Sequence, residues 1–332
     1  MTKLKAIFIG SPQLFPRVYS SSAIDRLRQW VDFMEEPLSK EEAALDSRVR
    51  EIEILLSTWG APRFDESFLS LTPKLKGIFY AAGSIRNLVT DAFWEKKIPI
   101  VSAYYANGLS VAHFTQACII FGLKNTLPIA RHHANHRGGD KGRPPCPGVM
   151  SGRVGLISLG VIARQVLSMI QPLGVEVFAY DPFVSGDEAK KLGVKLVDLD
   201  TLFQTCEVVS LHAPLLPETE GMIKGKHLAA MPPHSTFINT ARGAVVQENE
   251  MIEVLQQRTD LQAYLDVTYP EPPAKDSPLY DLANVFLTPH IAGSVGRECY
   301  RMGELVVDEV ERFCKGESLQ WSISREQAAR MA

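Results

Sequence analysis

The sequence predicts an α/β protein in which helices cover parallel β-sheets. Short β-type runs alternate with helix-like segments along the whole chain, and this alternation is typical of βαβ units. The chain has 332 residues, which suits two domains at roughly 150 residues each. Apolar residues make up 45% and charged residues 22% of the chain, the balance of a globular protein.

The first part of the chain predicts one series of alternating elements. Its β-type runs are AIFIG, EIEILLSTWG, LKGIFYAAG and IPIVSAY, at residues 6–10, 51–60, 75–83 and 98–104. Helix-like segments lie between them at residues 22–31 and 87–97. We expect a long helix over residues 108–126 with Ser110 as its N-cap, and a loop over the Gly- and Pro-rich residues 137–152.

A second series begins after this loop. Six β-type runs lie at residues 153–158, 175–181, 206–213, 236–241, 261–267 and 284–290. Helices are expected at residues 161–171, 248–259 and 297–316. Six strands in this order suit a complete doubly wound nucleotide-binding sheet.

Composition narrows the range of partners. The formal net charge of −3 gives no reason to expect nucleic acid or an anionic membrane as the main partner. The five cysteines are scattered without C-x-x-C spacing, so we expect reduced thiols and no metal site. The run AIFIG is too short for a signal peptide, and no stretch approaches the roughly 18 apolar residues of a membrane helix. A cytoplasmic protein is expected.

The turn at residues 154–167, VGLISLGVIARQVL, connects a predicted strand to a predicted helix. Dinucleotide-binding turns read G-x-G-x-x-G/A, and this turn reads Ser158-x-Gly160-x-x-Ala163. Gly160 keeps the position at which the backbone approaches the pyrophosphate, and Ala163 still allows helix to pack on strand. Asp181 follows 21 positions after Gly160, where a carboxylate accepts hydrogen bonds from ribose hydroxyls and repels a 2′-phosphate. The pattern favours NAD over NADP, and an ordinary strand–helix junction is the alternative.

Polar residues follow three later strands. Arg242 comes after one β-type run, Glu271 lies in the loop beyond another, and His290 directly follows a third. Ligands bind at the carboxyl ends of strands in such sheets. Arginine suits a substrate carboxylate, histidine moves a proton to or from a carbonyl oxygen, and a carboxylate beside it favours the protonated ring. Taken singly, these residues also fit a surface charge and ordinary loops; their combination predicts interconversion of a 2-oxo acid and a 2-hydroxy acid.

Four segments together resemble the D-isomer-specific 2-hydroxyacid dehydrogenase family. They are HAPLLPETEGMI, MPPHSTFINTARGAVV, LDVTYPEPP and SPLYDLANVFLTPHIAG, in the order and at the intervals of the family's motifs. The resemblance implies Arg242, Glu271 and His290 as the catalytic trio, with Asp266 holding the nicotinamide carboxamide. Further implied cofactor contacts are Ser158, Gly160, Val161, Ile162, Asp181, His212, Ala213, Pro214, Thr219, Thr240 and Ala241.

The resemblance also implies a domain arrangement. A doubly wound Rossmann-type NAD domain, residues 105–291, is inserted in a smaller flavodoxin-like α/β substrate domain made of residues 1–104 and 292–332. Ala82, Gly83 and Ser84 would bind the substrate, Gly83 and Ser84 through their backbone amides. Members of the family are commonly homodimers through the cofactor domain.

Three features depart from the family pattern. Ser158 replaces a glycine, and His113 stands where the family usually has an acid. The basic segment RHHANHRGGDKGR carries His132, His133 and His136, and it reads as a solvated or interface segment rather than a site for an anion or a metal. We expect an NAD-dependent oxidoreductase that interconverts a small 2-oxo acid and its D-2-hydroxy acid. The alternatives are an NAD(H)-sensing, corepressor-like switch with little turnover and an inactive relative that binds no cofactor.

Overall fold

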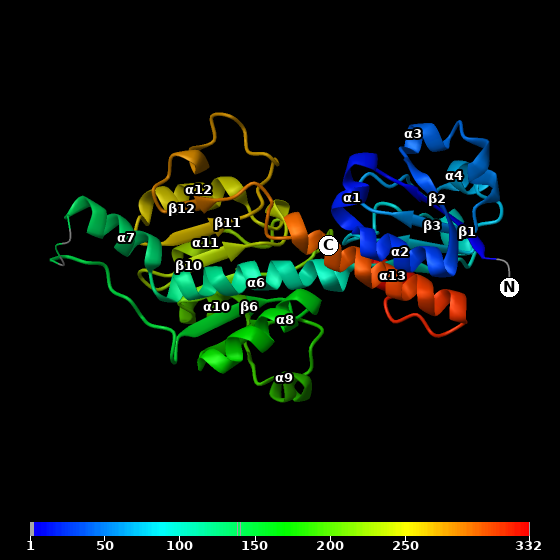
Figure 1. Cartoon of the computed structure of the whole chain (residues 1–332). Helices are drawn as coiled ribbons and strands as arrows, with labels where there is room; N and C mark the ends of the chain where they lie inside the picture. The colour runs from blue at the N-terminus through cyan, green and yellow to red at the C-terminus, as the bar shows by residue number, and fades with distance from the viewer. Residues whose placement is uncertain (1–2, 138, 140, 332) are drawn as a thin grey trace. The chain divides into compact units, whose positions relative to one another are not determined.

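The computed structural model describes residues 3–137, 139 and 141–331. The chain divides into two compact units, which are Met1–Gly108 with Ser294–Met331 (unit 1) and Leu109–Gly293 (unit 2). Each unit contains a parallel β-sheet with helices against it (Figure 1). The structure thus confirms the predicted α/β class with parallel sheets.

Unit 1 is built on a five-stranded sheet of order β2-β1-β3-β4-β5, and all its pairings are parallel. This is the doubly wound order of flavodoxin-like folds. One strand, β2, was not expected from the sequence. Its run VDFMEEPL contains three acidic residues and a proline, a composition that only an edge strand tolerates. The strands are β1 (Leu4–Ile9), β2 (Val31–Leu38), β3 (Ile54–Ser57), β4 (Gly77–Tyr80) and β5 (Ile100–Ser102).

Apolar side chains on the two faces of this sheet form two separate cores. Successive residues of β1 alternate between them, with Phe8 in one and Ile7 in the other. The first core includes α2 and α13, which are also joined by an ion pair of 2.7 Å between Arg26 and Glu304. The helices of unit 1 are α1 (Phe15–Val18), α2 (Ser21–Trp30), α3 (Lys40–Ala43), α4 (Glu66–Leu71), α5 (Asp91–Glu95), α13 (Cys299–Lys315) and α14 (Arg325–Ala329).

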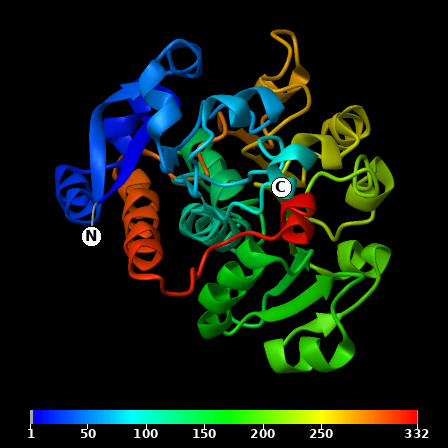
Figure 2. The ribbon, with the colours of Figure 1, turned by 90° about the vertical axis from the view of Figure 1, so that its right-hand side faces the viewer.

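The C-terminal residues are fixed to unit 1. Glu309, 1% exposed in α13, accepts hydrogen bonds from the backbone N–H groups of Gln320 and Trp321 at 2.9 and 3.0 Å. Ser322 then forms an antiparallel bridge with β5, and Arg325 of α14 forms an ion pair with Asp91 of α5. Figure 2 shows the chain after α13 running on to α14, the red helix at the C-terminus. The residues after α13 therefore cover the β5 edge of the sheet.

Unit 2 is built on a seven-stranded parallel sheet of order β12-β11-β10-β9-β6-β7-β8. Six of these strands coincide with the six predicted runs, and the order is that of a doubly wound dinucleotide-binding sheet. The seventh, β8, has two residues at the edge. The strands are β6 (Arg153–Ile157), β7 (Glu176–Tyr180), β8 (Lys195–Leu196), β9 (Val208–Leu211), β10 (Thr236–Asn239), β11 (Gln262–Leu265) and β12 (Val285–Leu287).

Helices cover both faces of the unit 2 sheet, again with one apolar core on each face. The central strands β6, β9, β10 and β11 are buried almost throughout, whereas β8 and β12 at the edges have no buried residue. The helices are α7 (Thr126–Asn135), α8 (Val161–Ile170), α9 (Gly186–Leu192), α10 (Leu199–Thr205), α11 (Gly225–Ala229) and α12 (Glu248–Gln257).

The long helix α6 (Tyr104–Leu123) begins earlier than predicted, so the assignment of Ser110 as N-cap was wrong. Ser110 is 3% exposed and lies inside the helix. The hydroxyl of Ser102 accepts the N–H of Tyr104 at 3.2 Å instead, directly after β5. The reason is that no residue from 104 to 109 stops a helix from starting at the end of the strand.

Helix α6 also corrects an expectation about membranes. It has 20 residues and is apolar enough to cross a membrane by length and composition, so the view that no segment approaches this requirement was wrong. The reason is that the helix contains polar residues but no Asp, Glu, Lys or Arg. In the structure 56% of its apolar window is buried inside the protein.

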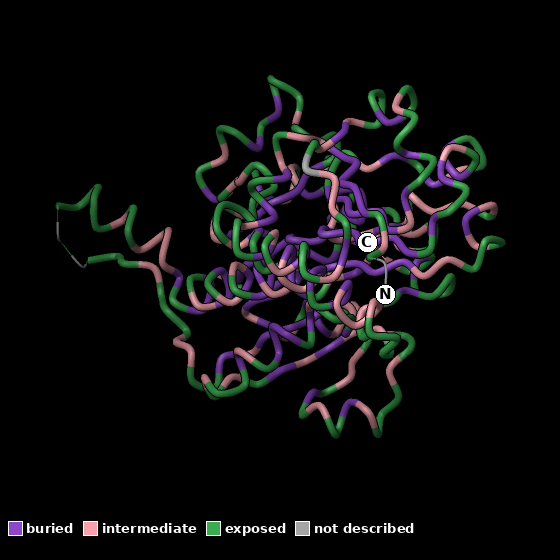
Figure 3. Tube along the Cα trace, turned by 45° about the vertical axis from the view of Figure 1, so that its right-hand side comes forward, coloured by how far each residue is buried: buried purple, intermediate pink, exposed green. Residues whose placement is uncertain are grey.

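The basic segment at residues 131–143 is partly helical. Its first five residues belong to α7, where the sequence had suggested no helix, and most of the segment is exposed (Figure 3). The rings of His132 and His136 stack at 4.0 Å between centroids. Residues 138 and 140 of this segment, which also fall in the predicted loop 137–152, lie outside the described residues.

The packing of α13 against α1 depends on the absence of a side chain at Gly303. A Cβ there would lie 2.1 Å from the carbonyl oxygen of Val18. We therefore expect Gly303→Ala to lower the free energy of unfolding by about 1–3 kcal/mol, as overpacking does, measured by urea denaturation. Gly186→Ala is the matched control, since a Cβ there meets no atom within 4 Å; a loss in the control equal to that of Gly303→Ala would contradict the packing argument.

Candidate functional site

Six strands of unit 2 end in one row. Because all are parallel, their carboxyl ends lie along the same edge of the sheet, where such folds bind ligands. The strand register aligns their last residues directly. Ile157 pairs with Tyr180 and Leu211, Asn239 pairs with Leu211 and Leu265, and Leu265 pairs with Leu287.

The turn after β6 holds a serine in the left-handed region. Ser158 has φ +73°, a conformation that glycine adopts without strain and most other residues avoid. The N–H of Ser158 bonds to the carbonyl of Tyr180 at 2.8 Å, and the N–H of Leu159 bonds to Oδ2 of Asp181 at 2.7 Å. Two hydrogen bonds to the end of β7 therefore fix a turn that lacks its first glycine.

Gly160 follows as the N-cap of α8. It has no side-chain cap, and a Cβ built on it would meet no atom within 4 Å. The first N–H groups of α8, at Val161 and Ile162, have no partners within the helix and favour an anion at this end. Ala163, fully buried, lets the helix pack on the sheet. Open space in front of a helix N-terminus fits a phosphate group.

Asp181 supports the same turn with both of its carboxylate oxygens. Besides the bond from Leu159 to Oδ2, the N–H of Phe183 donates to Oδ1 at 2.8 Å. Each oxygen of an ionised carboxylate accepts more than one hydrogen bond. Asp181 therefore holds the turn and keeps acceptor capacity for a hydroxyl.

The loop after β9 contains His212 in a neutral state. Its Nε2 lies 3.0 Å from the hydroxyl of Ser210, and burial lowers the pKa of His212 to about 4. Ala213, 3% exposed, continues into a turn closed by Thr219, whose hydroxyl donates to the carbonyl of Pro214 at 2.5 Å. The predicted cofactor residues of this segment thus form one closed turn.

Arg242 follows β10 in a loop shaped by Asn239. The side chain of Asn239 accepts the N–H of Ala241 at 3.0 Å and donates to the carbonyl of Arg242 at 3.1 Å. The hydroxyls of Thr240 and Thr115 are 3.0 Å apart. The guanidinium of Arg242 donates to the carbonyl of Ala241 at 2.6 Å.

The charge of Arg242 lies in a partly dehydrated position. Burial lowers the pKa of the Arg242 guanidinium, and the negative charge of Glu271 raises it. Among the described residues no carboxylate forms an ion pair with Arg242. A permanently charged fork with free donors suits a carboxylate ligand.

Glu271 and His290 are in direct polar contact. Oε1 of Glu271 lies 2.5 Å from Nδ1 of His290. Both side chains remain accessible, with 39% and 48% exposure. The pairing leaves Nε2 of His290 for another partner, and the carboxylate orients the ring.

Asp266, at the end of β11, anchors the loop that carries His290. Its buried carboxylate, 2% exposed, accepts hydrogen bonds from the Thr288 hydroxyl (2.6 Å) and from the N–H groups of Ile291 and Ala292 (both 2.8 Å). Its carbonyl accepts the N–H of His290 at 2.9 Å. His290 itself has φ +54°, and this set of bonds holds it there.

The substrate residues predicted in unit 1 follow β4. The hydroxyl of Ser102 donates to the carbonyls of Gly83 and Ala82 at 2.5 and 3.1 Å. The hydroxyl of Ser84 accepts the N–H of Arg86 at 3.3 Å. This segment therefore lies at the carboxyl end of the unit 1 sheet, held against the end of β5.

Several residues that shape the site were not singled out from the sequence. Asn239 and Thr288 act through the hydrogen bonds described above. Gly243 allows the Arg242 loop to touch Thr268, since a Cβ on Gly243 would lie 2.0 Å from backbone atoms of Thr268. The only sign of this tight fit in the sequence is the dipeptide Arg242-Gly243. His113 is exposed on α6, and no group of three or more His, Cys, Asp or Glu residues suited to a metal occurs in the part of the chain that the structure describes.

Comparison with known proteins identifies the family. Residues 118–292 match the profile described as D-isomer specific 2-hydroxyacid dehydrogenase, NAD binding domain. This chain belongs to that family. The match confirms the resemblance seen in the sequence, and NAD is the cofactor of the family's domain, as predicted.

Individual relatives of this 2-hydroxyacid dehydrogenase chain extend the match beyond that domain. D-3-phosphoglycerate dehydrogenase of Methanocaldococcus jannaschii is 31% identical over 283 residues, 84% of this chain and 53% of that protein. (S)-sulfolactate dehydrogenase of Chromohalobacter salexigens is 34% identical over 253 residues, 75% of this chain and 81% of that protein. The chain spans about half the length of the phosphoglycerate dehydrogenases that it matches.

A solved structure shows the same fold. The holo form of D-mandelate dehydrogenase from Rhodotorula graminis superposes with a TM-score of 0.79 at 21% identity, covering 98% of this chain and 99% of that one. The doubly wound unit 2 described above is therefore the Rossmann NAD domain of the family, with a second α/β unit in the same chain.

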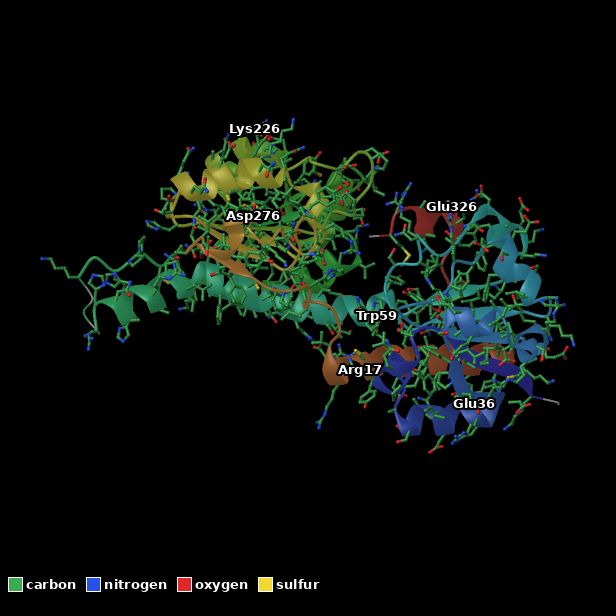
Figure 4. All side chains as sticks on the ribbon, turned by 90° about the horizontal axis from the view of Figure 1, so that it is seen from above. Arg17, Glu36, Trp59, Lys226, Asp276 and Glu326 are labelled. Carbon is green, nitrogen blue, oxygen red and sulfur yellow. The ribbon has the colours of Figure 1, made fainter. Side chains whose placement is uncertain are left out.

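The anchoring by Asp266 predicts the effect of Asp266→Asn. The amide would turn an N–H₂ group toward one of three donors, so we expect a loss of about 1–3 kcal/mol in the free energy of unfolding. Hydrogen exchange at Ile291 and Ala292 should accelerate. Asp276→Asn is the control, in the exposed loop beyond Glu271 (Figure 4); unchanged exchange in Asp266→Asn would contradict the anchoring role.

The neutral His212 predicts a pH dependence of stability. Its folded pKa of about 4 lies below the value of about 6.5 in an unfolded chain, so protonation favours unfolding. This contribution to stability is present above about pH 6.5 and is lost as the pH falls toward 4. Urea denaturation should show a shallower decline over this range in His212→Asn than in wild type, while a control at exposed His133 should follow wild type. Parallel curves for wild type and His212→Asn would contradict the assignment.

Proposed function

We propose that this protein is an NAD-dependent oxidoreductase that interconverts a small 2-oxo acid and its D-2-hydroxy acid. The observation that carries the proposal is the 2.5 Å contact between Glu271 and His290, at the same sheet edge as the nucleotide turn. An acid–base pair beside a dinucleotide turn is what a hydride-transfer reaction of an alcohol and a carbonyl requires.

The cofactor fits the residues of unit 2. The N-terminus of α8 with Gly160 would hold the pyrophosphate, and the carboxylate of Asp181 would accept hydrogen bonds from the ribose and disfavour a 2′-phosphate. The loops at His212–Thr219 and Thr240–Ala241 would line the rest of the dinucleotide, and Asp266 the carboxamide. When bound, NADH would supply the hydride for reduction and NAD⁺ would accept it in oxidation.

Arg242 binds the carboxylate of the substrate. Its guanidinium is partly dehydrated and has no carboxylate partner among the described residues of the chain. A ligand carboxylate would therefore supply the hydrogen bonds that water no longer makes to it. The positive charge also polarises the adjacent carbonyl of a 2-oxo acid. Arg242 thus fixes both the position and the polarity of the reacting group.

His290 moves the proton. In the direction of reduction, Nε2 of the protonated imidazole donates to the carbonyl oxygen, and in the direction of oxidation it accepts the proton of the hydroxyl. Glu271 at Nδ1 holds the ring in place and stabilises the positive charge between these steps. No other titratable side chain is required.

Unit 1 is proposed as the substrate-binding domain, with Ala82, Gly83 and Ser84 contributing to carboxylate binding. The support is their place at the carboxyl end of the unit 1 sheet and the family resemblance. A homodimer through the cofactor domain and a cytoplasmic location belong to the same proposal. Light scattering of the purified protein tests the dimer.

The proposal names a class of substrate and not a single compound. Two relatives are named for 3-phosphoglycerate and for sulfolactate, so the oxo forms of both acids belong in a panel with glyoxylate, pyruvate, hydroxypyruvate and longer 2-oxo acids. Oxidation of NADH, followed by absorbance and by chiral analysis of the product, tests the proposal.

The expected result is turnover with at least one acid of the panel to a D-2-hydroxy acid. His290→Gln should lower kcat by about 10²–10⁴-fold, the usual contribution of a general acid. Arg242→Gln should lower kcat/KM by at least about tenfold through loss of a charged hydrogen bond. Exposed His133→Gln is the control. NADH binding without turnover on any acid would contradict the enzyme and favour a switch that senses NAD(H).

A further inference from the structure

The loop that carries Glu271 is braced from one side by the segment that follows Arg242. The close approach of Gly243 to Thr268 leaves no room for a side chain, since a Cβ would lie 2.0 Å from the Thr268 backbone. The hydroxyl of Thr268 donates to the carbonyl of Pro270 at 2.8 Å. The backbone just before Glu271 is therefore fixed by packing and by a local hydrogen bond.

Glu248 adds a third contact to this loop. It is the first residue of α12, six positions after Arg242, and its Oε2 accepts the N–H of Tyr269 at 2.7 Å. Tyr269 lies two positions before Glu271 and is 63% exposed. Because the N–H could be satisfied by water instead, folding alone does not require this bond; what the bond fixes is the direction of the loop.

The position of the Glu248 carboxylate is unfavourable for its charge, because it is partly removed from water. It is half-buried, and burial raises the pKa of Glu248, while the bond from the Tyr269 N–H lowers it. Among the described residues no cation forms an ion pair with it. The N-terminus of α12 provides only the modest stabilisation that helix ends give to acids. A dehydrated, unpaired carboxylate contributes little to stability, which points to a role in geometry.

We propose that Glu248 is a positioning residue for the acid–base pair. By holding the N–H of Tyr269, it sets the loop so that Oε1 of Glu271 meets Nδ1 of His290. Its consequence for turnover rests on the proposed function, whereas its consequence for the Glu271–His290 contact does not. Asp266 holds the loop of His290 by accepting the N–H groups of Ile291 and Ala292. Each member of the pair is therefore positioned by a different carboxylate.

Three variants test the proposal. Glu248→Ala removes the acceptor, and Glu248→Gln keeps an acceptor oxygen without the charge. Glu253→Ala is the control, because Glu253 is exposed on the same helix. Thermal unfolding of each variant comes first, and the comparison uses samples that are folded at the temperature of measurement.

The first readout needs neither cofactor nor substrate. The ring signals of His290 are followed by NMR at one fixed pH in the cofactor-free protein, and are assigned by their loss in His290→Gln. Glu271→Gln should shift these signals, because it changes the group that contacts Nδ1. Glu248→Ala should shift them in the same direction, while Glu248→Gln and Glu253→Ala should leave them near wild type.

The second readout is a double-mutant cycle in kcat/KM. Glu248→Ala should lower kcat/KM about tenfold in the wild-type background and have little further effect in Glu271→Gln, because residues that act through one contact are not additive. A purely structural role would give the same loss in both backgrounds. Equal losses, or His290 ring signals unmoved by Glu248→Ala, would overturn the proposal.

The two readouts also separate this inference from the proposed function. If Glu271→Gln shifts the His290 ring signals and Glu248→Ala does not, the role of Glu248 is wrong and the pair stands. If Glu271→Gln itself leaves the signals unchanged, the contact between Glu271 and His290 fails, and the proposed function fails with it.

Discussion

Every strand of the unit 2 sheet runs parallel to its neighbours, in a register that brings six strand ends into one row. Loops that leave this row supply the nucleotide turn, Asp181, His212, Arg242, Asp266 and His290. None of them needs to be close to another in the sequence. The register of backbone hydrogen bonds therefore determines that the residues proposed to bind the cofactor and those proposed for acid–base chemistry share one edge.

Carboxylate and amide side chains at the strand ends hold the loops of this row in fixed positions. Asp266 binds three donors of the loop around His290, Asn239 closes the loop around Arg242, and Asp181 ties the turn of Ser158 to β7. In each case a polar side chain at a strand end satisfies backbone groups that the sheet leaves free. The turn tolerates Ser158 at φ +73° because its neighbour Leu159 is held by Asp181.

Local sequence was sufficient for six strands of unit 2, which alternation and apolar runs predicted. The residue types after these strands led to Arg242, Glu271 and His290 as site residues, which stays a prediction. Two edge strands, β2 and β8, were missed, because β2 is acidic and β8 has two residues. The start of α6 was misplaced, because the cap comes from Ser102 at the end of a strand and not from a serine inside the helix.

Contacts between distant segments could not be predicted from sequence periodicity. The bonds of Asp266 reach 22 to 26 positions along the chain, and that of Glu248 reaches 21. Such partners follow from strand order and loop path, which a single sequence does not contain. The predicted contact of Asp266 with the nicotinamide stays a prediction, and the structure adds its role in holding the His290 loop.

Binding of oxamate, an unreactive analogue of a 2-oxo acid, tests the shared edge most directly. Calorimetric titration is made with and without saturating NADH, in wild type and in Arg242→Gln. The account predicts that NADH tightens oxamate binding, and that oxamate tightens NADH by the same factor, as linkage requires. Arg242→Gln should lose oxamate and keep NADH. Oxamate affinity that is independent of NADH, or retained in Arg242→Gln, would contradict a single site for cofactor and acid.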